Sequence, residues 1–254
     1  MFIHPTAIIE EDVEIGAGTA IWDHVHIRRG ARIGEQCIIG EKTYIAYQVR
    51  IGNRVKINAF VYICAAVTIE DGVMVSAGTI FTNDRFPRAA TVDLKQLRPS
   101  EMDEHTRPTL VREGATIGAG CTIGNDLVIG RFAMVGMGSL VTRSAPDFHL
   151  VLGHPAVPVG CVCRCGQIFL RYSDVMPQSR GPWDKLQLVS DGIGKGYGQA
   201  GGLSYPGAQA VAPETEALHS RHSADCLGEM GCPACGLKYL VRNRVVEELT
   251  PPLP

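Results

Sequence analysis

The stretch RIGEQCIIGEKTYIAYQVRIGNRVKI, residues 32–57, decides the fold because an isoleucine returns at every sixth position. These isoleucines are Ile33, Ile39, Ile45, Ile51 and Ile57. A second register lies two residues before the later ones and holds small or β-branched side chains, namely Cys37, Thr43, Val49 and Val55. Residues two apart on a strand share one face. Each hexad therefore predicts a short strand with one apolar face.

The rhythm extends outward from this stretch in both directions. It runs from Ile3 to Phe81, where twelve of fourteen positions are Ile, and it returns between Val111 and Val141. A period of six fits neither a helix nor a simple hairpin. Glycines that follow the isoleucines, such as Gly34, tolerate the backbone angles of a tight corner. We therefore expect a solenoid of stacked corners rather than a β-sandwich, whose strands would vary in length.

Composition excludes several classes of protein. The 254 residues are 45% hydrophobic and 20% charged, and the formal net charge is −2. This balance gives no reason to expect nucleic acid or an anionic membrane as a partner. The first residues lack the pattern of a signal peptide, and no apolar run reaches the ~20 residues that span a bilayer. We expect a cytoplasmic protein without membrane insertion, in which the nine cysteines are thiols or metal ligands.

The rhythm stops at Asn83 and resumes in the same phase after residues 84–109. That segment contains ten charged residues, so it does not belong to the core. Because the phase is kept, we expect a loop extruded from one corner of the solenoid. Long loops in compact domains are usually functional or disordered. The segment is therefore either part of a functional site or a tolerated surface insertion.

The hexads resemble those of the hexapeptide-repeat acyltransferases over roughly residues 3–160. This resemblance implies an all-β fold, a left-handed parallel β-helix with three hexads per coil, for a first domain at residues 1–160. It also implies a homotrimer in which the extruded loop reaches over a neighbouring subunit. The active site of such a trimer lies between two subunits.

Several short motifs narrow the resemblance, namely Ile21-Trp22, His26, Phe81-Thr82-Asn83-Asp84, Pro87-Arg88 and Gly153-His154-Pro155-Ala156. They resemble the N-acetyltransferases of nucleotide-linked 3-amino sugars, including a UDP-2-acetamido-3-amino glucuronate. The implied reaction moves an acetyl group from acetyl-coenzyme A to the amine of a UDP- or dTDP-linked sugar, for a surface polysaccharide. The chain departs from the glucuronate enzymes at Asn58-Ala59-Phe60, where they carry polar amides, so the sugar stays open.

The resemblance also implies roles for single residues. Asn83 lies beside the acceptor amine and the thiol of coenzyme A, unless it only forms a turn at the mouth of the loop. His26 orients the sugar or accepts the amine proton, unless it is an ordinary interface residue. Arg88 pairs with a phosphate or a carboxylate, unless it is a solvated charge. The remaining candidates are His24 and Asp84 for the sugar, and Arg143, Gly153, His154, Pro155 and Ala156 for coenzyme A.

Cysteines mark a second module at residues 161–254. Cys232 and Cys235 form a C-x-x-C-G turn, and Cys163 and Cys165 precede a glycine, with Cys161 as a spare ligand. Two such turns can bind one structural zinc ion through four thiolates, with no open position for catalysis. The Gly-rich stretch at about 177–216 is typical of a flexible insertion. We expect a zinc-ribbon-like module or, alternatively, reduced buried cysteines without metal.

Three other functions compete with N-acetyl transfer. A zinc hydrase of the γ-type carbonic anhydrase class needs three histidines around one metal, and the repeat offers only His4, His24 and His26, which do not fit. A noncatalytic scaffold with a zinc-ribbon docking module would not bind acetyl-coenzyme A. A sugar O-acetyltransferase would depend more strongly on a base, for which His26 or His24 is the candidate.

Overall fold

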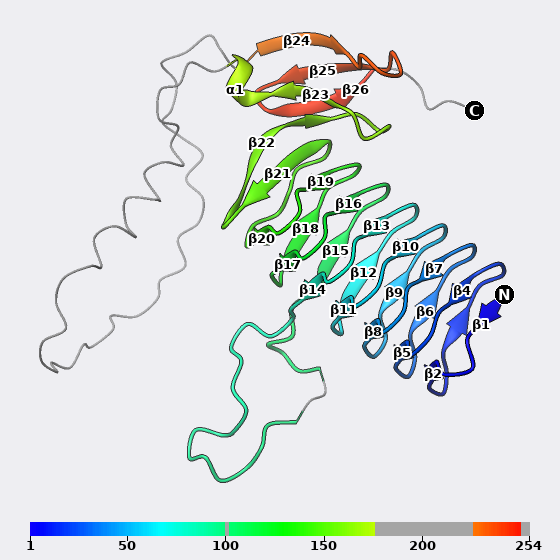
Figure 1. Ribbon diagram of the computed structural model, residues 1–254. Helices are drawn as coiled ribbons and strands as arrows, with labels where there is room; N and C mark the ends of the chain where they lie inside the picture. Colours follow the sequence, from blue (N-terminus) through cyan, green and yellow to red (C-terminus); the bar gives the residue numbers. More distant parts are fainter. Residues whose placement is uncertain (100–101, 176–225, 250–254) are drawn as a thin grey trace, which may run out of the picture.

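The computed structural model describes residues 1–99, 102–175 and 226–249. These residues form a parallel β-solenoid with an extruded segment on one side and a small sheet at the end far from the N-terminus (Figure 1). Every third strand of the coil joins the same sheet, so three sheets make the walls. This architecture confirms the solenoid that the hexads predict.

The first sheet contains β1 (Phe2–Ile3), β4 (Ala20–Ile21), β7 (Ile38–Ile39), β10 (Lys56–Ile57), β13 (Met74–Val75), β16 (Thr116–Ile117) and β19 (Met134–Val135). The second contains β2 (Ile8–Ile9), β5 (His26–Ile27), β8 (Tyr44–Ile45), β11 (Tyr62–Ile63), β14 (Ile80–Phe81), β17 (Thr122–Ile123) and β20 (Leu140–Val141). The third contains β3 (Glu14–Ile15), β6 (Arg32–Ile33), β9 (Arg50–Ile51), β12 (Val67–Ile69), β15 (Thr109–Val111) and β18 (Leu127–Ile129). Before the extruded segment, paired residues are three hexads apart, as with Phe2 and Ala20.

The two apolar registers fill the interior of the coil. Every isoleucine of the repeat from Ile21 to Ile69 is buried, and Phe81 takes the same place with 1% of its surface exposed. Cys37 of the second register is fully buried as well. Ile3 is 40% exposed because it lies in the terminal coil. The core is therefore one continuous column along the axis of the solenoid.

The structure corrects the explanation for the glycines that follow the isoleucines. Gly34 is not among the residues with positive φ. A Cβ at this position would lie 2.5 Å from the carbonyl oxygen of Gly52 in the next coil, so Gly34 is needed for close approach of the two coils. The left-handed corner residue comes two positions later, at Gln36, whose φ is 55°. The tight corner itself therefore does not require glycine.

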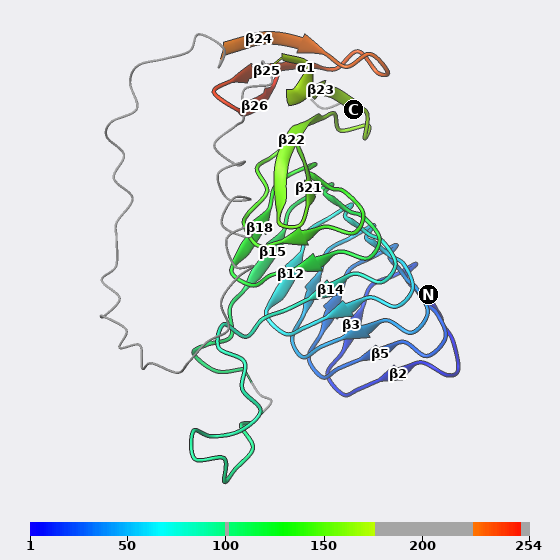
Figure 2. The same cartoon turned by 60° about the vertical axis from the view of Figure 1, so that its left-hand side comes forward.

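The extruded segment leaves the coil after β14 and returns at β15. It projects away from the stack of coils in both views (Figure 2). Ile80 before it pairs with Thr122 after it, so the coil continues across the interruption. Thr109, which we expected to end the loop, is 1% exposed and begins β15. The loop therefore ends one residue earlier than its charge pattern suggests.

The C-terminal residues cover the end of the solenoid. The first sheet continues into β21 (His149–Gly153), β22 (Ala156–Val162) and β23 (Ile168–Arg171), which precede the short helix α1 (Tyr172–Val175). A separate sheet contains β24 (Cys226–Gly231), β25 (Lys238–Arg242) and β26 (Val245–Glu248). Tyr239 of this sheet is fully buried, stacks on Phe169 at 4.8 Å between ring centroids and packs against Phe148 of the last coil.

Two expectations concern segments beyond these elements. The insertion expected at about 177–216 lies outside the described residues. Among the described residues, no helix is long and apolar enough to cross a membrane.

Candidate functional site

The extruded segment leaves the coil through a neck of two antiparallel chain segments. Asp84 forms an isolated bridge with Thr106, and the N–H of Arg107 donates to the carbonyl oxygen of Asn83 at 2.8 Å. Asn125 of the following coil donates its Nδ2 to the carbonyl oxygen of Asp84 at 3.0 Å. These bonds fix the neck against the wall of the solenoid.

Asn83 is held at this neck by its own side chain. Its Nδ2 donates to the carbonyl oxygen of Ala65 at 3.2 Å, and no hydrogen bond involves its Oδ1 within the described part of the chain. The residue is half-buried and lines a pocket of about 330 Å³. Because a carboxamide oxygen accepts hydrogen bonds, the arrangement leaves Asn83 an acceptor for an N–H group in the pocket.

Charged residues of the extruded segment form the opposite wall of the pocket. They include two predicted residues, Asp84 and Arg88, together with Arg98 and Asp103. Arg98 lies 3.9 Å from Asp84 and 3.1 Å from Asp103. The backbone N–H of His105 and the Arg98 guanidinium hold the pKa of Asp103 below its usual value. Most of this wall is therefore neutralised internally, and it brings Asn83 close to two of the predicted sugar-binding residues.

The two predicted histidines lie elsewhere on the coil. His26 is the outward-facing residue of β5; its Nε2 is 2.9 Å from Oε1 of Glu10, and its ring meets that of Tyr44 edge-on. His24 lies in the turn before β5, with a φ of 54°. Its ring is largely exposed beside Asp23.

The order of strands in the second sheet places the candidates along one line. β5 lies three strands before β14, and β20 lies two strands beyond β14. Since adjacent strands are ~4.8 Å apart, His26 is roughly 14 Å from Asn83 along the stack, and Arg143 is about 10 Å away on the other side. One small amine in the pocket therefore cannot contact both His26 and Asn83 of the same chain.

The predicted coenzyme A residues gather at the last coil. Arg143 follows β20, and the turn from Gly153 to Ala156 joins β21 to β22. Gly153 has a φ of 113°, and its N–H donates to the hydroxyl of buried Ser139 at 3.2 Å. His154 and Pro155 are exposed, with a cis peptide bond between them, while Ala156 packs on the core. This turn is thus anchored on the coil and open to solvent at its tip.

Sequence reasoning missed Asn125 at the neck. It follows Ile123 by two residues, as Asn83 follows Phe81, so both occupy the same place in their hexads. The signal was therefore present in the repeat. Arg98 was missed too, and only its contacts across the loop distinguish it from the other charges there.

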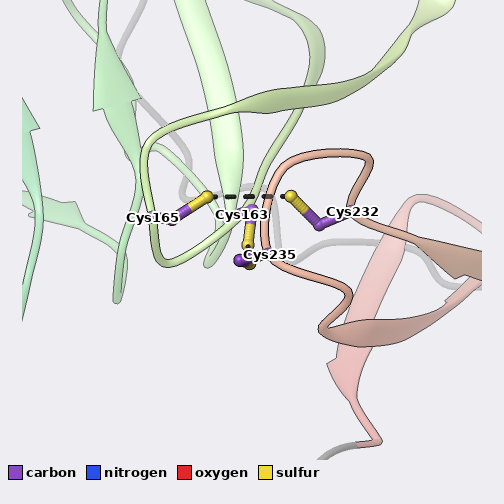
Figure 3. Close-up of side chains that lie close together, drawn as sticks. All are labelled: Cys163, Cys165, Cys232 and Cys235. Atoms are coloured by element: carbon purple, nitrogen blue, oxygen red, sulfur yellow. Dashed lines mark hydrogen bonds between the residues drawn. The ribbon is translucent and has the colours of Figure 1, made fainter.

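Four cysteines meet between the end of the solenoid and the C-terminal sheet. Cys163 and Cys165 lie in the turn between β22 and β23, and Cys232 and Cys235 lie between β24 and β25 (Figure 3). All four sulfur atoms lie within 4.8 Å of one another. The Sγ atoms of Cys163 and Cys235 are 3.4 Å apart, and those of Cys165 and Cys232 are 3.7 Å apart.

This geometry fits a tetrahedral metal site. Zinc–sulfur bonds of about 2.3 Å place thiolate sulfurs about 3.8 Å apart. The hydroxyl of buried Tyr239 lies 3.1 Å from Sγ of Cys163 and accepts the N–H of Arg164, so its own proton is directed to that sulfur. Burial raises the pKa of Cys232, but hydrogen bonds from the backbone N–H groups of Cys235 and Ala234 outweigh this effect. The net result is a pKa of about 7, below the usual value for a thiol.

The spare ligand Cys161 is not part of this cluster. It is fully buried, and its sulfur lies 3.6 Å from the hydroxyl of Tyr172. Among the described residues, the four cysteines are the sole group of three or more side chains placed to hold a metal. The histidines of the coil therefore form no three-histidine centre there.

Comparison with known proteins shows that this solenoid of hexads belongs to a class of transferases. The family model of the bacterial transferase hexapeptide (six repeats) matches residues 12–47 and 48–83. A dTDP-3-amino-3,6-dideoxy-alpha-D-galactopyranose 3-N-acetyltransferase of Aneurinibacillus thermoaerophilus is 45% identical over 164 residues, which are 65% of this chain and 80% of that protein. The chain therefore belongs to the hexapeptide-repeat family of bacterial acyltransferases, which confirms the resemblance.

Two further comparisons are more distant. An acyl-[acyl-carrier-protein]–UDP-N-acetylglucosamine O-acyltransferase of Brucella ovis is 47% identical over 36 residues, 14% of this chain and 13% of that protein. A solved structure of AntD, an N-acyltransferase from Bacillus cereus in complex with dTDP and 3-hydroxybutyryl-CoA, is 23% identical, with a TM-score of 0.44. It covers 64% of this chain and 80% of that chain.

Proposed function

We propose that this protein transfers the acetyl group of acetyl-coenzyme A to the amine of a dTDP-linked 3-amino-3,6-dideoxyhexose. The observation that carries the proposal is the 45% identity to the 3-N-acetyltransferase over 80% of that enzyme. A UDP-linked 3-amino sugar is the second acceptor to test. The product has the chemistry of a building block for a surface polysaccharide.

Asn83 is the residue that meets the acceptor amine in this proposal. Its Nδ2 is fixed by the carbonyl of Ala65, so Oδ1 accepts an N–H of the neutral amine and directs the nitrogen lone pair toward the thioester carbonyl. The nitrogen–carbon bond forms as the carbon–sulfur bond breaks, and the thiolate leaves as coenzyme A. The amine proton passes to water or to that thiolate.

The line of candidates along the second sheet supports a place for each substrate. The nucleotide sugar extends from Asn83 toward β5, where His26 orients its far half rather than taking the amine proton. Arg88 and Asp84 lie at the sides of the sugar, and exposed His24 lies at the nucleotide end of the substrate. Acetyl-coenzyme A extends the other way, toward Arg143 and the turn formed by Gly153, His154, Pro155 and Ala156. The two substrates then meet at the neck pocket.

The working unit in this proposal is a cytoplasmic homotrimer. Five large apolar side chains are exposed in the described part of the extruded segment, namely Phe86, Val92, Leu94, Leu97 and Met102. Leu94 and Leu97 each expose 82% of their surface, and Val92 is fully exposed. Apolar side chains clustered on a projecting segment favour a partner surface. A neighbouring subunit provides it, which places the neck pocket between two chains. Both proposed substrates are metabolites of the cytoplasm.

The cysteine cluster holds a structural zinc ion in this proposal. Cys163, Cys165, Cys232 and Cys235 supply four thiolates, and Tyr239 supports Cys163. Four protein ligands leave no open coordination position, so the ion joins two parts of the fold and takes no part in the reaction. The C-terminal sheet forms no strand pairs with the solenoid among the described residues, and the ion would fasten it there.

The decisive experiment measures release of free thiol from acetyl-coenzyme A. The purified protein is mixed with dTDP- and UDP-linked 3-amino and 4-amino sugars, each tested alone. We expect rapid release with the dTDP-linked 3-amino sugar and slow release with its 4-amino isomer. The proposal fails if none of the sugars stimulates release and acetyl-coenzyme A does not bind.

A further inference from the structure

A cation at the neck of the extruded segment has no partner among the residues that the structure describes. Arg107 is half-buried, and its Nε is inaccessible to water without a hydrogen-bond partner. Within the described residues no ion pair or hydrogen bond involves its side chain. Arg28 has the other such Nε, but it lies against the carboxylate of Glu10. Arg107 is therefore the guanidinium whose buried donor lacks an acceptor.

The two arginines that line the pocket each already have an acceptor within the segment, although exposed Arg88 keeps further donors for the sugar. Arg98 contacts Asp84 and Asp103. Arg88 donates to the carbonyl of Pro87 at 2.8 Å. A buried donor without an acceptor is unfavourable, and a guanidinium makes its strongest hydrogen bonds to anionic oxygens. The terminal nitrogens of Arg107, unlike Nε, are not among the buried unpartnered atoms, so an anionic oxygen of a ligand can reach the guanidinium there.

Arg107 is also placed beside the proposed reaction centre. Its N–H donates to the carbonyl of Asn83, which makes the two residues opposite neighbours in the antiparallel neck. Opposite residues in such a pair carry their side chains on the same face, with Cβ atoms about 5 Å apart. Asn83 therefore has Arg107 as its neighbour, although Arg107 does not itself line the pocket, so its guanidinium would reach a ligand from beside Asn83. In a 3-amino sugar nucleotide, the first phosphate is separated from that amine by only part of one sugar ring.

We propose that Arg107 binds a phosphate oxygen of the nucleotide sugar and so positions the sugar amine at Asn83. This inference rests on the proposed function and adds a residue that sequence reasoning treated only as one loop charge among ten. Arg107 acts in binding and does not touch the reacting atoms. Coenzyme A is the other source of phosphate within reach, and the experiment separates the two.

The test measures binding of dTDP alone and of coenzyme A alone by titration calorimetry. It uses the full-length wild type, Arg107→Gln, Arg107→Lys and the matched neck control Arg85→Gln, whose side chain is exposed. We expect Arg107→Gln to weaken dTDP binding by about ten- to a hundredfold. Arg107→Lys should lose less because it keeps the charge. Arg85→Gln should bind as the wild type does, and coenzyme A binding should change in none of them.

Each other outcome has a definite meaning. Loss of coenzyme A binding alone overturns the assignment to the nucleotide sugar and moves the phosphate contact to the cofactor. Unchanged binding of both ligands in Arg107→Gln refutes the role of Arg107 while the proposed function stands. Equal loss of both, together with a lower melting temperature, means that Arg107 only holds the neck. A wild type that binds neither ligand refutes the proposed function itself.

Discussion

Replacing Asn83 by alanine separates a chemical role from a structural one. As structure, the side chain contributes one neutral hydrogen bond, from Nδ2 to the carbonyl of Ala65 at 3.2 Å. Such a bond contributes about 1 kcal/mol to stability, which is a factor of about five in an equilibrium. As chemistry, loss of a group that positions or polarises reactants costs about 10²–10³ in kcat. The two readings therefore differ by more than a factor of ten.

The chain offers a matched control one residue away. Thr82 donates its hydroxyl to the carbonyl of Ile123 in the next coil, also at 3.2 Å. Thr82→Ala thus loses the same kind of bond at the same neck. We expect both variants to lose about 1 kcal/mol of unfolding free energy, while only Asn83→Ala loses kcat, by about a hundredfold or more.

The assay is thiol release under saturating acetyl-coenzyme A, with denaturant unfolding of each variant in parallel. If Asn83→Ala retains kcat within a factor of about five of Thr82→Ala, one lost hydrogen bond explains it. Asn83 would then be a turn residue, and the reasoning about the amine would be wrong. A fall in stability far beyond 1 kcal/mol would likewise remove the chemical interpretation, because the neck itself would have opened.

Three further predictions concern the scaffold. Metal analysis should find one zinc per chain, and Cys165→Ser should lose it and lower the melting temperature; a metal-free wild type would refute the site. Gly34→Ala should cost about 1–3 kcal/mol in denaturant unfolding, because the new Cβ would meet the next coil, and a neutral effect would contradict that contact. The N–H and side-chain amide of Asn53 hold the pKa of Asp71 below its usual 3.8. Since this pKa is depressed in the folded state, Asp71 stabilises at neutral pH and ceases to do so as the pH falls through the lowered value. Asp71→Asn should therefore lower the free energy of unfolding at pH 7 by less than about 1 kcal/mol, which is measured as a lower melting temperature. Near pH 2 the melting temperature should be unchanged.

The coil could be predicted because every hexad has the same pattern, which favours a short strand with one buried apolar face. A buried column from Ile21 to Ile69 follows from counting by six, and the phase across residues 84–109 identified the extruded segment. The reason for Gly34 was not predictable, since it depends on a contact with the next coil rather than on the local chain. Stacking distances between coils are a property of the assembled solenoid.

The site was predictable only in part, for the same reason. The C-x-x-C spacing pointed to Cys232 and Cys235, but the choice between Cys161 and Cys163 needed the turn after β22. Arg107 looked like any other loop charge in the sequence. Its burial and its pairing with Asn83 arise when the two limbs of the neck meet. The spacing of residues along the chain predicts turns that hold metal ligands. It does not predict which charged residues become buried next to one another in the folded protein.

The separation of His26 from Asn83 holds for an assembly as well as for one chain. Consider a trimer packed side by side about an axis parallel to the stack of coils. Rotation about that axis leaves the height of every residue unchanged, so His26 of any subunit stays about 14 Å below the level of Asn83. A base at His26 could therefore not reach the amine at Asn83 in such a trimer. The length of an extended nucleotide sugar, by contrast, spans that height. This is why we assign His26 to the far half of the substrate, and why N-acetyl transfer, which needs no strong protein base, agrees with the layout better than O-acetyl transfer does.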